Sequence, residues 1–176
     1  MKRLSVHLGA PAVFLLLLLL PLLPSCMYHL GGLKSRDMEG MQTFCVDMFA
    51  NQTTQPLVSM QMTTALADAL QRDGTYRMAS PDTCDFRVSG VVSGVNAYGL
   101  TTNPDDTYIS SEIGLTVSVH YTITDCRTNK CIKTGVVQAE GSFFNTTGNI
   151  QQARDDALSY ATRKAASDIV NQLTIP

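Results

Sequence analysis

The sequence has no tryptophan, only three histidines and few charged residues, which make up 16% of its 176 positions. Lys and Arg number 13 against 15 Asp and Glu, so no basic excess marks the chain as a nucleic-acid binder. No apolar run reaches the roughly 20 residues that a membrane-spanning helix needs. The scarcity of histidine argues against a histidine-rich metal centre. What remains is a mildly acidic chain with five cysteines and one short apolar segment near its start.

Residues 1–25 have the pattern of an export signal. Lys2 and Arg3 form a positive start, and residues 11–23 are nearly all apolar but too short to span a bilayer comfortably. Removing this segment lowers the count of Lys and Arg from 13 to 11 against 15 acids, which leaves a net charge of −4. A remainder of roughly 150 residues is expected to form one domain with a real core.

Cys26 is the predicted site of lipid attachment. Residues 23–26 resemble a lipobox, in which the cysteine thiol receives a diacylglycerol and becomes the new N-terminus, although Pro24 is unusual there. The alternative is an ordinary secretory signal with Cys26 incidental. Met27 follows instead of Asp, so retention in the inner membrane is not indicated. We therefore expect an outer-membrane protein, lipid-anchored on the periplasmic side, with residues 26–40 as its tether.

Besides Cys26 the chain has four cysteines, an even number that suits an oxidising compartment. Cys126 and Cys131 enclose four residues, and across a four-residue hairpin loop they would stand opposite each other at bridging distance. Half a metal site is the alternative, but no second pair has matching spacing. Cys45 and Cys84 then remain as a second pair. Strand parity argues against that pair, because Cys45 alternates with apolar neighbours whereas Cys84 shares the parity of apolar residues.

Hydrophobic periodicity predicts six elements in residues 41–176. Alternation predicts four strands, over residues 41–49, 85–98, 112–123 and 132–144. Helical spacing predicts helices over residues 56–74 and 149–173. The order β-α-β-β-β-α indicates a single α+β domain, a four-stranded mixed sheet with two helices on one face. The first two strands, joined through a helix, are expected to lie parallel.

Local signals set the expected details of these elements. Pro56 suits a first helical residue, and Gly74 suits the left-handed position that ends a helix. Gly90 and Gly94 suggest a bulge or a close backbone approach within the second strand, and residues 100–107 carry turn chemistry. The first helix shows an apolar stripe of Met62, Ala65, Leu66, Ala69 and Leu70. The second shows one of Ile150, Ala153, Ala157, Ala161, Ala165, Ile169 and Leu173.

No catalytic constellation is found, so no enzymatic activity, cofactor or metal is predicted. Outside the export segment the only histidines are His29 and His120, and neither has a Cys, Ser or carboxylate at a spacing that implies a nucleophile pair or a metal cage. Arg127, Lys130 and Lys133 gather at the tip of the last hairpin and are candidates for holding phosphate or carboxylate groups. A solvated hairpin tip is the alternative.

Four segments carry a resemblance to the LptE family of lipopolysaccharide-assembly lipoproteins. Residues 26–32 resemble the start of the mature family sequence, where a Tyr and a Gly closely follow the lipidated Cys. Residues 49–57 are similar to its strand-to-helix passage, residues 66–74 to its first helix and residues 84–90 to its second strand. The ordered set spans essentially all of residues 26–176; it departs from the family in Pro24, Met27 and the extra cysteines.

The resemblance implies a non-enzymatic role. LptE-like proteins plug the lumen of the outer-membrane β-barrel LptD, assist its assembly and bind lipopolysaccharide on its way to the outer leaflet. Under this hypothesis Arg127, Lys130 and Lys133 contact lipopolysaccharide phosphates. A protein of this kind needs no nucleic acid and no cofactor.

The competing class is an outer-membrane lipoprotein that activates a peptidoglycan synthase. Such proteins share a strand–Asn-x-Thr–helix beginning on a similar α+β domain, but they usually carry a long linker across the periplasm. Here only about 15 residues separate Cys26 from the first strand, a reach of roughly 50 Å. That short tether favours a partner at the outer membrane itself. The third hypothesis is a structural lipoprotein whose partner is unknown.

Overall fold

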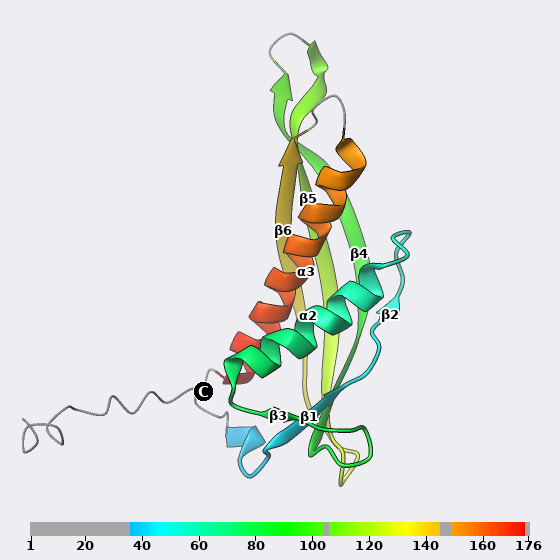
Figure 1. The fold of residues 1–176 in the computed structure, drawn as a ribbon. Helices are drawn as coiled ribbons and strands as arrows, with labels where there is room; N and C mark the ends of the chain where they lie inside the picture. The colour runs from blue at the N-terminus through cyan, green and yellow to red at the C-terminus, as the bar shows by residue number, and fades with distance from the viewer. Residues whose placement is uncertain (1–35, 104–105, 145–148, 175–176) are drawn as a thin grey trace, which may run out of the picture.

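The computed structural model describes residues 36–103, 106–144 and 149–174 (Figure 1). The elements, in chain order, are η2 (Arg36–Met38), β1 (Thr43–Val46), β2 (Ala50–Asn51), α2 (Val58–Asp73), β3 (Arg77–Met78), β4 (Phe86–Asn103), β5 (Asp106–Asp125), β6 (Cys131–Phe144) and α3 (Ile150–Thr174). The predicted α+β class and the order of the principal elements are confirmed.

All strands belong to one mixed sheet, in the order β3-β1-β4-β5-β6, with β2 also pairing with β4. The four-strand prediction was too low, because β2 and β3 are two-residue strands that are too short to show periodicity. β1 is parallel to β4, as expected, with Phe44 opposite Phe86. β4, β5 and β6 form an antiparallel meander.

Both helices cover the same face of this sheet (Figure 1). On that face β5 presents alternate residues that are fully or almost fully buried, namely Leu115, Val117, Val119, Tyr121 and Ile123. The predicted stripe of α2 is buried in full against the sheet and α3. The apolar residues that alternate along β5 and those that recur every 3.6 residues along α2 are therefore buried in one core.

The ends of α2 follow the sequence signals in part. Gly74 ends the helix with φ 73°, in the left-handed region, and its N–H donates to the Leu70 carbonyl. Pro56 is not the first helical residue, since the helix starts at Val58 and Pro56 lies in the turn before it. In α3 the stripe is buried from Ala157 onward, whereas Ile150 is 45% exposed, because the first turn of α3 extends past the packed core.

The β4–β5 hairpin is longer than predicted. β4 continues to Asn103 and β5 begins at Asp106, so most of the segment expected as a turn is strand. The register shift between Val92 and Gly94 is the expected bulge, and Gly90 is where the ring of Phe49 lies directly on the backbone. Within residues 36–103, 106–144 and 149–174, no helix is both long and apolar enough to span a bilayer.

Candidate functional site

The turn between β5 and β6 is built around Asp125. Its carboxylate accepts hydrogen bonds from the backbone N–H of Arg127 at 2.8 Å and of Thr128 at 3.3 Å. Its own N–H donates to the Lys130 carbonyl at 2.9 Å, and Asn129 has φ 55°. These N–H donors hold the pKa of Asp125 below its ordinary value, and the backbone N–H of Arg127 has the largest effect. An aspartate rather than a disulfide therefore fixes this hairpin tip.

The three basic residues predicted for this tip do not act as one group. Arg127 and Lys130 are exposed within the turn. Lys133 lies in β6, and its amine donates to the Gln172 carbonyl oxygen at 2.5 Å. Because Gln172 is in the last turn of α3, Lys133 serves as a cation at a helix C-terminus, where unpaired carbonyls favour positive charge.

Asp85 ties the start of β1 to the start of β4 beside this tip. Its Oδ2 accepts from the N–H of Gln42 at 2.9 Å, and from the N–H and the hydroxyl of Thr43 at 3.0 Å each. These donors lower the pKa of Asp85, that of the Gln42 amide most, and the nearby charge of Arg127 adds to the effect. The tip is thus a mixed-charge surface in which Arg127 faces two carboxylates and Lys130 contributes a further positive charge.

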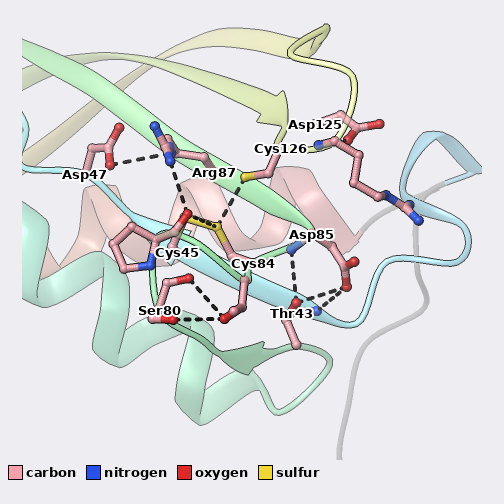
Figure 2. Close-up of a disulfide and its surroundings, with 12 residues drawn as sticks. Thr43, Cys45, Asp47, Ser80, Cys84, Asp85, Arg87, Asp125 and Cys126 are labelled. Carbon is pink, nitrogen blue, oxygen red and sulfur yellow. Dashed lines mark hydrogen bonds and ion pairs between the residues drawn. A yellow bond between two sulfur atoms is a disulfide. The ribbon is translucent and has the colours of Figure 1, made fainter.

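The disulfide joins Cys45 to Cys84, and not Cys126 to Cys131 as the spacing predicts. Figure 2 shows the bond between Cys45 and Cys84, whose Cα atoms are 5.7 Å apart, with the Cys126 thiol beside it. The predicted Cys126–Cys131 pair is not formed, and both are free thiols in the described part of the chain. The physical reason is register: Cys131 pairs with Thr124 across a bulge, and Cys126 lies beyond the strand, where its N–H donates to the Asp85 carbonyl.

The parity objection to Cys45–Cys84 does not apply, because Cys84 is not a strand residue. It ends the turn that precedes β4, and its N–H donates to the Ser80 carbonyl at 3.1 Å. Its side chain is therefore free of the alternation that β4 imposes from Phe86 onward. Both cysteines are buried, with Cys45 2% and Cys84 5% exposed.

The second face of the sheet is covered by no helix among the described elements (Figure 1). Successive rows across β4, β5 and β6 on this open face are Ser89–Thr122–Thr134, Val91–His120–Val136, Gly94–Ser118–Gln138 and Asn96–Thr116–Glu140. His120 is exposed there, because it alternates with the buried Val119 and Tyr121 along β5. Most members are hydroxyls or amides, so this open face can form many hydrogen bonds with a polar wall.

The helix-covered side has a shallow groove that the sequence did not reveal. It encloses about 280 Å³ between α2 and α3 and is lined by Met60, Gln61, Thr64, Ala65, Asp68, Ser159, Thr162 and Arg163. Only the crossing of the two helices brings these residues together. Small Ala65 and buried Thr162 leave the space, which is open to solvent.

The predicted lipid-attachment residue Cys26, the export segment 1–25 and the tether up to residue 35 lie outside the described residues. The first described element, η2, lies at the same end of the molecule as the β5–β6 turn (Figure 1). There Asp37 and Met38 lie beside Lys133, Gln172 and Leu173 around a small cavity. The first described residues therefore lie at the end of the molecule that carries the β5–β6 turn.

Comparison with known families decides the affiliation. The family model LptE, described as Lipopolysaccharide-assembly, matches residues 41–173. The chain belongs to the LptE family. This match covers every strand and nearly all of α3, so the LptE-family domain coincides with the sheet and the two helices described above. A search of curated protein sequences finds no match to this LptE-family protein.

Solved structures share the fold at low sequence identity. Protein CT253 of Chlamydia trachomatis matches with a TM-score of 0.55 and 10% identity, over 76% of this chain and 96% of that chain. The PelC dodecamer from Paraburkholderia phytofirmans matches with a TM-score of 0.53 and 15% identity, over 82% and 96%. Protein XCC0632 from Xanthomonas campestris matches at 0.51 and 9% identity, over 74% and 81%. These likenesses extend to the fold alone.

Proposed function

We propose that this LptE-family protein is a non-enzymatic outer-membrane lipoprotein that occupies the lumen of an LptD-type β-barrel, helps the barrel to assemble and binds lipopolysaccharide during its delivery to the outer leaflet. The observation that carries the proposal is the family match over residues 41–173. The open face of the sheet, the short reach from Cys26 to η2 and the exposed Arg127 and Lys130 support it.

The open face of the sheet suits the inner wall of a barrel. Barrel interiors are polar, and the side chains that line them alternate with lipid-facing ones along each strand. Thr116, Ser118 and Thr122 run along the middle strand of the open face, with exposed Gln138 and Glu140 beside them on β6. Such an array replaces its hydrogen bonds to water by bonds to a polar wall without burying an unpaired group.

A lipid anchor at Cys26 would keep the β5–β6 turn near the membrane. Cys26 precedes Arg36, where η2 begins, by ten residues, a reach of about 35 Å at full extension. A diacylated Cys26 in the inner leaflet of the outer membrane would keep η2 within that distance of the lipid headgroups, and the β5–β6 turn lies at the same end of the molecule (Figure 1).

Arg127 and Lys130 are the proposed contacts with lipopolysaccharide phosphates. Both are exposed on a turn that Asp125 holds in place, so phosphate binding would cost little loop ordering. Lys133 is the third candidate, but a phosphate would compete there with the Gln172 carbonyl. We therefore expect Arg127 and Lys130 to carry most of the binding.

The partner is tested by gentle detergent extraction of membranes and affinity purification of the full-length protein. A stoichiometric, heat-modifiable barrel of LptD size is the expected product. Recovery of a peptidoglycan synthase in its place would favour the activator class. Labelling with a radioactive fatty acid, with Cys26→Ala as the control, tests the tether separately, and a wild-type protein that takes up no label would exclude it.

The lipopolysaccharide contact is tested with variants that separate charge from helix capping. The double variant Arg127→Ser/Lys130→Ser is expected to reduce lipopolysaccharide binding at least tenfold, and Lys133→Ser less. The matched control is Arg163→Ser/Lys164→Ser, which removes two exposed charges from α3. Unchanged binding and surface delivery after replacing Arg127, Lys130 and Lys133 together with Ser would rule out the assignment.

The sequence feature shared with synthase activators has a structural explanation here. Asn51 Nδ2 donates to the Gln55 carbonyl at 2.7 Å, and Asn51 Oδ1 accepts from the N–H and hydroxyl of Thr53 at 2.8 Å each. These bonds close the loop between β2 and α2. Because the Asn-x-Thr motif shapes this loop, it does not by itself favour the activator function.

A further inference from the structure

Three cysteine sulfurs gather at the end of β1, and one of them has two sulfur neighbours. Cys84 is bonded to Cys45, and its Sγ also lies 3.2 Å from the Sγ of Cys126 (Figure 2). The Sγ atoms of all three lie within 4.8 Å of one another. A free thiol thus touches a sulfur of a disulfide, which is the arrangement from which thiol–disulfide exchange starts.

The backbone holds the thiol in this place. The Cys126 N–H donates to the Asp85 carbonyl at 2.9 Å, which ties the end of β5 to the residue after Cys84. Cys84 is itself held by the hydrogen bond of its N–H to the Ser80 carbonyl. Main-chain hydrogen bonds therefore hold the backbones of both cysteines beside each other, within reach of a contact between the two sulfurs.

We propose that Cys126 is an internal exchange thiol that moves the disulfide between two positions. The Cys126 thiolate attacks Sγ of Cys84, a Cys84–Cys126 bond forms and the Cys45–Cys84 bond breaks. Cys45 leaves as a thiolate and takes up the proton that Cys126 gave to solvent. One disulfide and one thiol are present before and after the step, so no oxidant or reductant is needed.

The two forms tie different strands together. The Cys45–Cys84 bond joins β1 to the turn before β4, across 39 residues. The exchanged bond would join that turn to the end of β5, across 42 residues. β1 would then be held to β4 without a covalent link, by its ladder, the Asp85 hydrogen bonds and the contacts of Asp47 with Arg87 and Val88, so exchange loosens the strand that follows the tether.

The surroundings of Cys126 set the pH at which exchange proceeds. Burial raises the pKa of the Cys126 thiol, and the carboxylates of Asp125 and Asp47 raise it further, while the guanidinium of Arg87 opposes them. The thiol is therefore mostly protonated at neutral pH. Because only the thiolate attacks, the exchange rate should rise about tenfold per pH unit until the pH reaches that pKa.

The test follows disulfide connectivity in the full-length protein extracted in detergent. Samples held between pH 5 and pH 9 are quenched with acid, alkylated with N-ethylmaleimide in denaturant and mapped by mass spectrometry without reduction. At pH 5 we expect label on Cys126 and Cys131 and none on Cys45. At higher pH a Cys84–Cys126 peptide and labelled Cys45 should appear together. Their absence at every pH would overturn the proposal.

Three variants identify the attacking thiol. Cys126→Ser keeps the Cys45–Cys84 bond and should show no labelled Cys45 at any pH. Cys131→Ser is the matched control and should exchange at the wild-type rate, whereas loss of exchange in it would make Cys131 the attacking thiol and overturn the proposal. Cys45→Ser, oxidised with glutathione disulfide, should form the Cys84–Cys126 bond, and pairing of Cys84 with Cys131 would contradict the geometry.

Discussion

The side-chain amine of Lys133 donates a hydrogen bond to the backbone carbonyl oxygen of Gln172, at 2.5 Å. Lys133 is in β6 and Gln172 is in the last turn of α3, so the bond fastens the end of the helix to the edge strand of the sheet. It also sets Lys133 apart from Arg127 and Lys130, which the sequence had grouped with it. Neighbouring basic residues thus have different roles in the fold: Lys133 binds the end of α3, whereas Arg127 and Lys130 are exposed to solvent.

Lys133→Met is expected to lower the free energy of unfolding by about 0.5–1 kcal/mol, because a cation at a helix C-terminus is removed while the apolar stem is kept. Urea denaturation at low ionic strength measures the effect, which should shrink as salt is added. Lys130→Met, an exposed lysine of the same hairpin, is the control and should leave the stability within about 0.5 kcal/mol of the wild type.

Asp85→Asn should destabilise the protein by about 1 kcal/mol at neutral pH, since the three hydrogen bonds from Gln42 and Thr43 lose their charged acceptor. The lowered pKa of Asp85 means that its contribution is fully present above the unfolded-state value near 3.8 and is lost as the pH falls through the folded-state pKa. Thermal melts from pH 7 to pH 2 should therefore show the two proteins converging below about pH 4. A gap that stays constant down to pH 2 would contradict this account.

Gly141→Ala should cost about 1–3 kcal/mol, because a Cβ there would stand 2.6 Å from the Ala157 carbonyl oxygen on α3 and would push the helix off β6. The matched control is Gly94→Ala, whose nearest neighbours would be at 3.6 and 3.9 Å, an ordinary contact distance. Chemical denaturation of both variants measures the difference. Equal stability of the two would show that α3 adjusts freely on the sheet.

Val136→Glu tests the open face as the surface that meets a barrel. Val136 is 54% exposed and lies beside His120, so a charge there should change the unfolding free energy by less than about 0.5 kcal/mol. Co-purification of the barrel should fall severalfold, because the charge would lose water against the wall. Lys164→Glu, on the exposed side of α3, is the control and should not reduce co-purification.

The sequence was sufficient for the elements whose burial is one-sided. β5 alternates apolar and polar residues over its core length, and α2 has an apolar stripe at helical spacing, so each pattern identifies both the element and its buried face. The end of α2 at Gly74 and the bulge near Gly94 could also be predicted from the sequence, since each depends on local backbone geometry. β2 and β3 were missed because two residues carry no period, and their existence depends on neighbouring strands.

The cysteine arrangement shows what sequence spacing cannot determine. Cys126 and Cys131 are close along the chain and looked like a pair, yet Cys84, 42 residues before Cys126, lies against it. That neighbour is fixed by the antiparallel pairing of β4 with β5, which sets Phe86 opposite Asp125, and by the hydrogen bond from the Cys126 N–H to the Asp85 carbonyl, both of which are long-range features. Periodicity indicates which face of a helix or strand is buried. Which residues from distant parts of the sequence come into contact is determined only by the tertiary structure.

By itself the sequence determined the α+β class, the core faces of β5 and α2, and the resemblance to the LptE family. Each of these depends on local sequence patterns, which can be recognised before the fold is known. Tertiary structure decided that Lys133 caps α3, that Asp125 and Asp85 organise the basic tip, and that Cys126 touches a disulfide. The contacts of Lys133, Asp85 and Cys126 join segments far apart in sequence, whereas Asp125 binds the amides of its own turn, which the pairing of β5 with β6 closes. Their formation is set by the register of the sheet and the crossing of the helices over it.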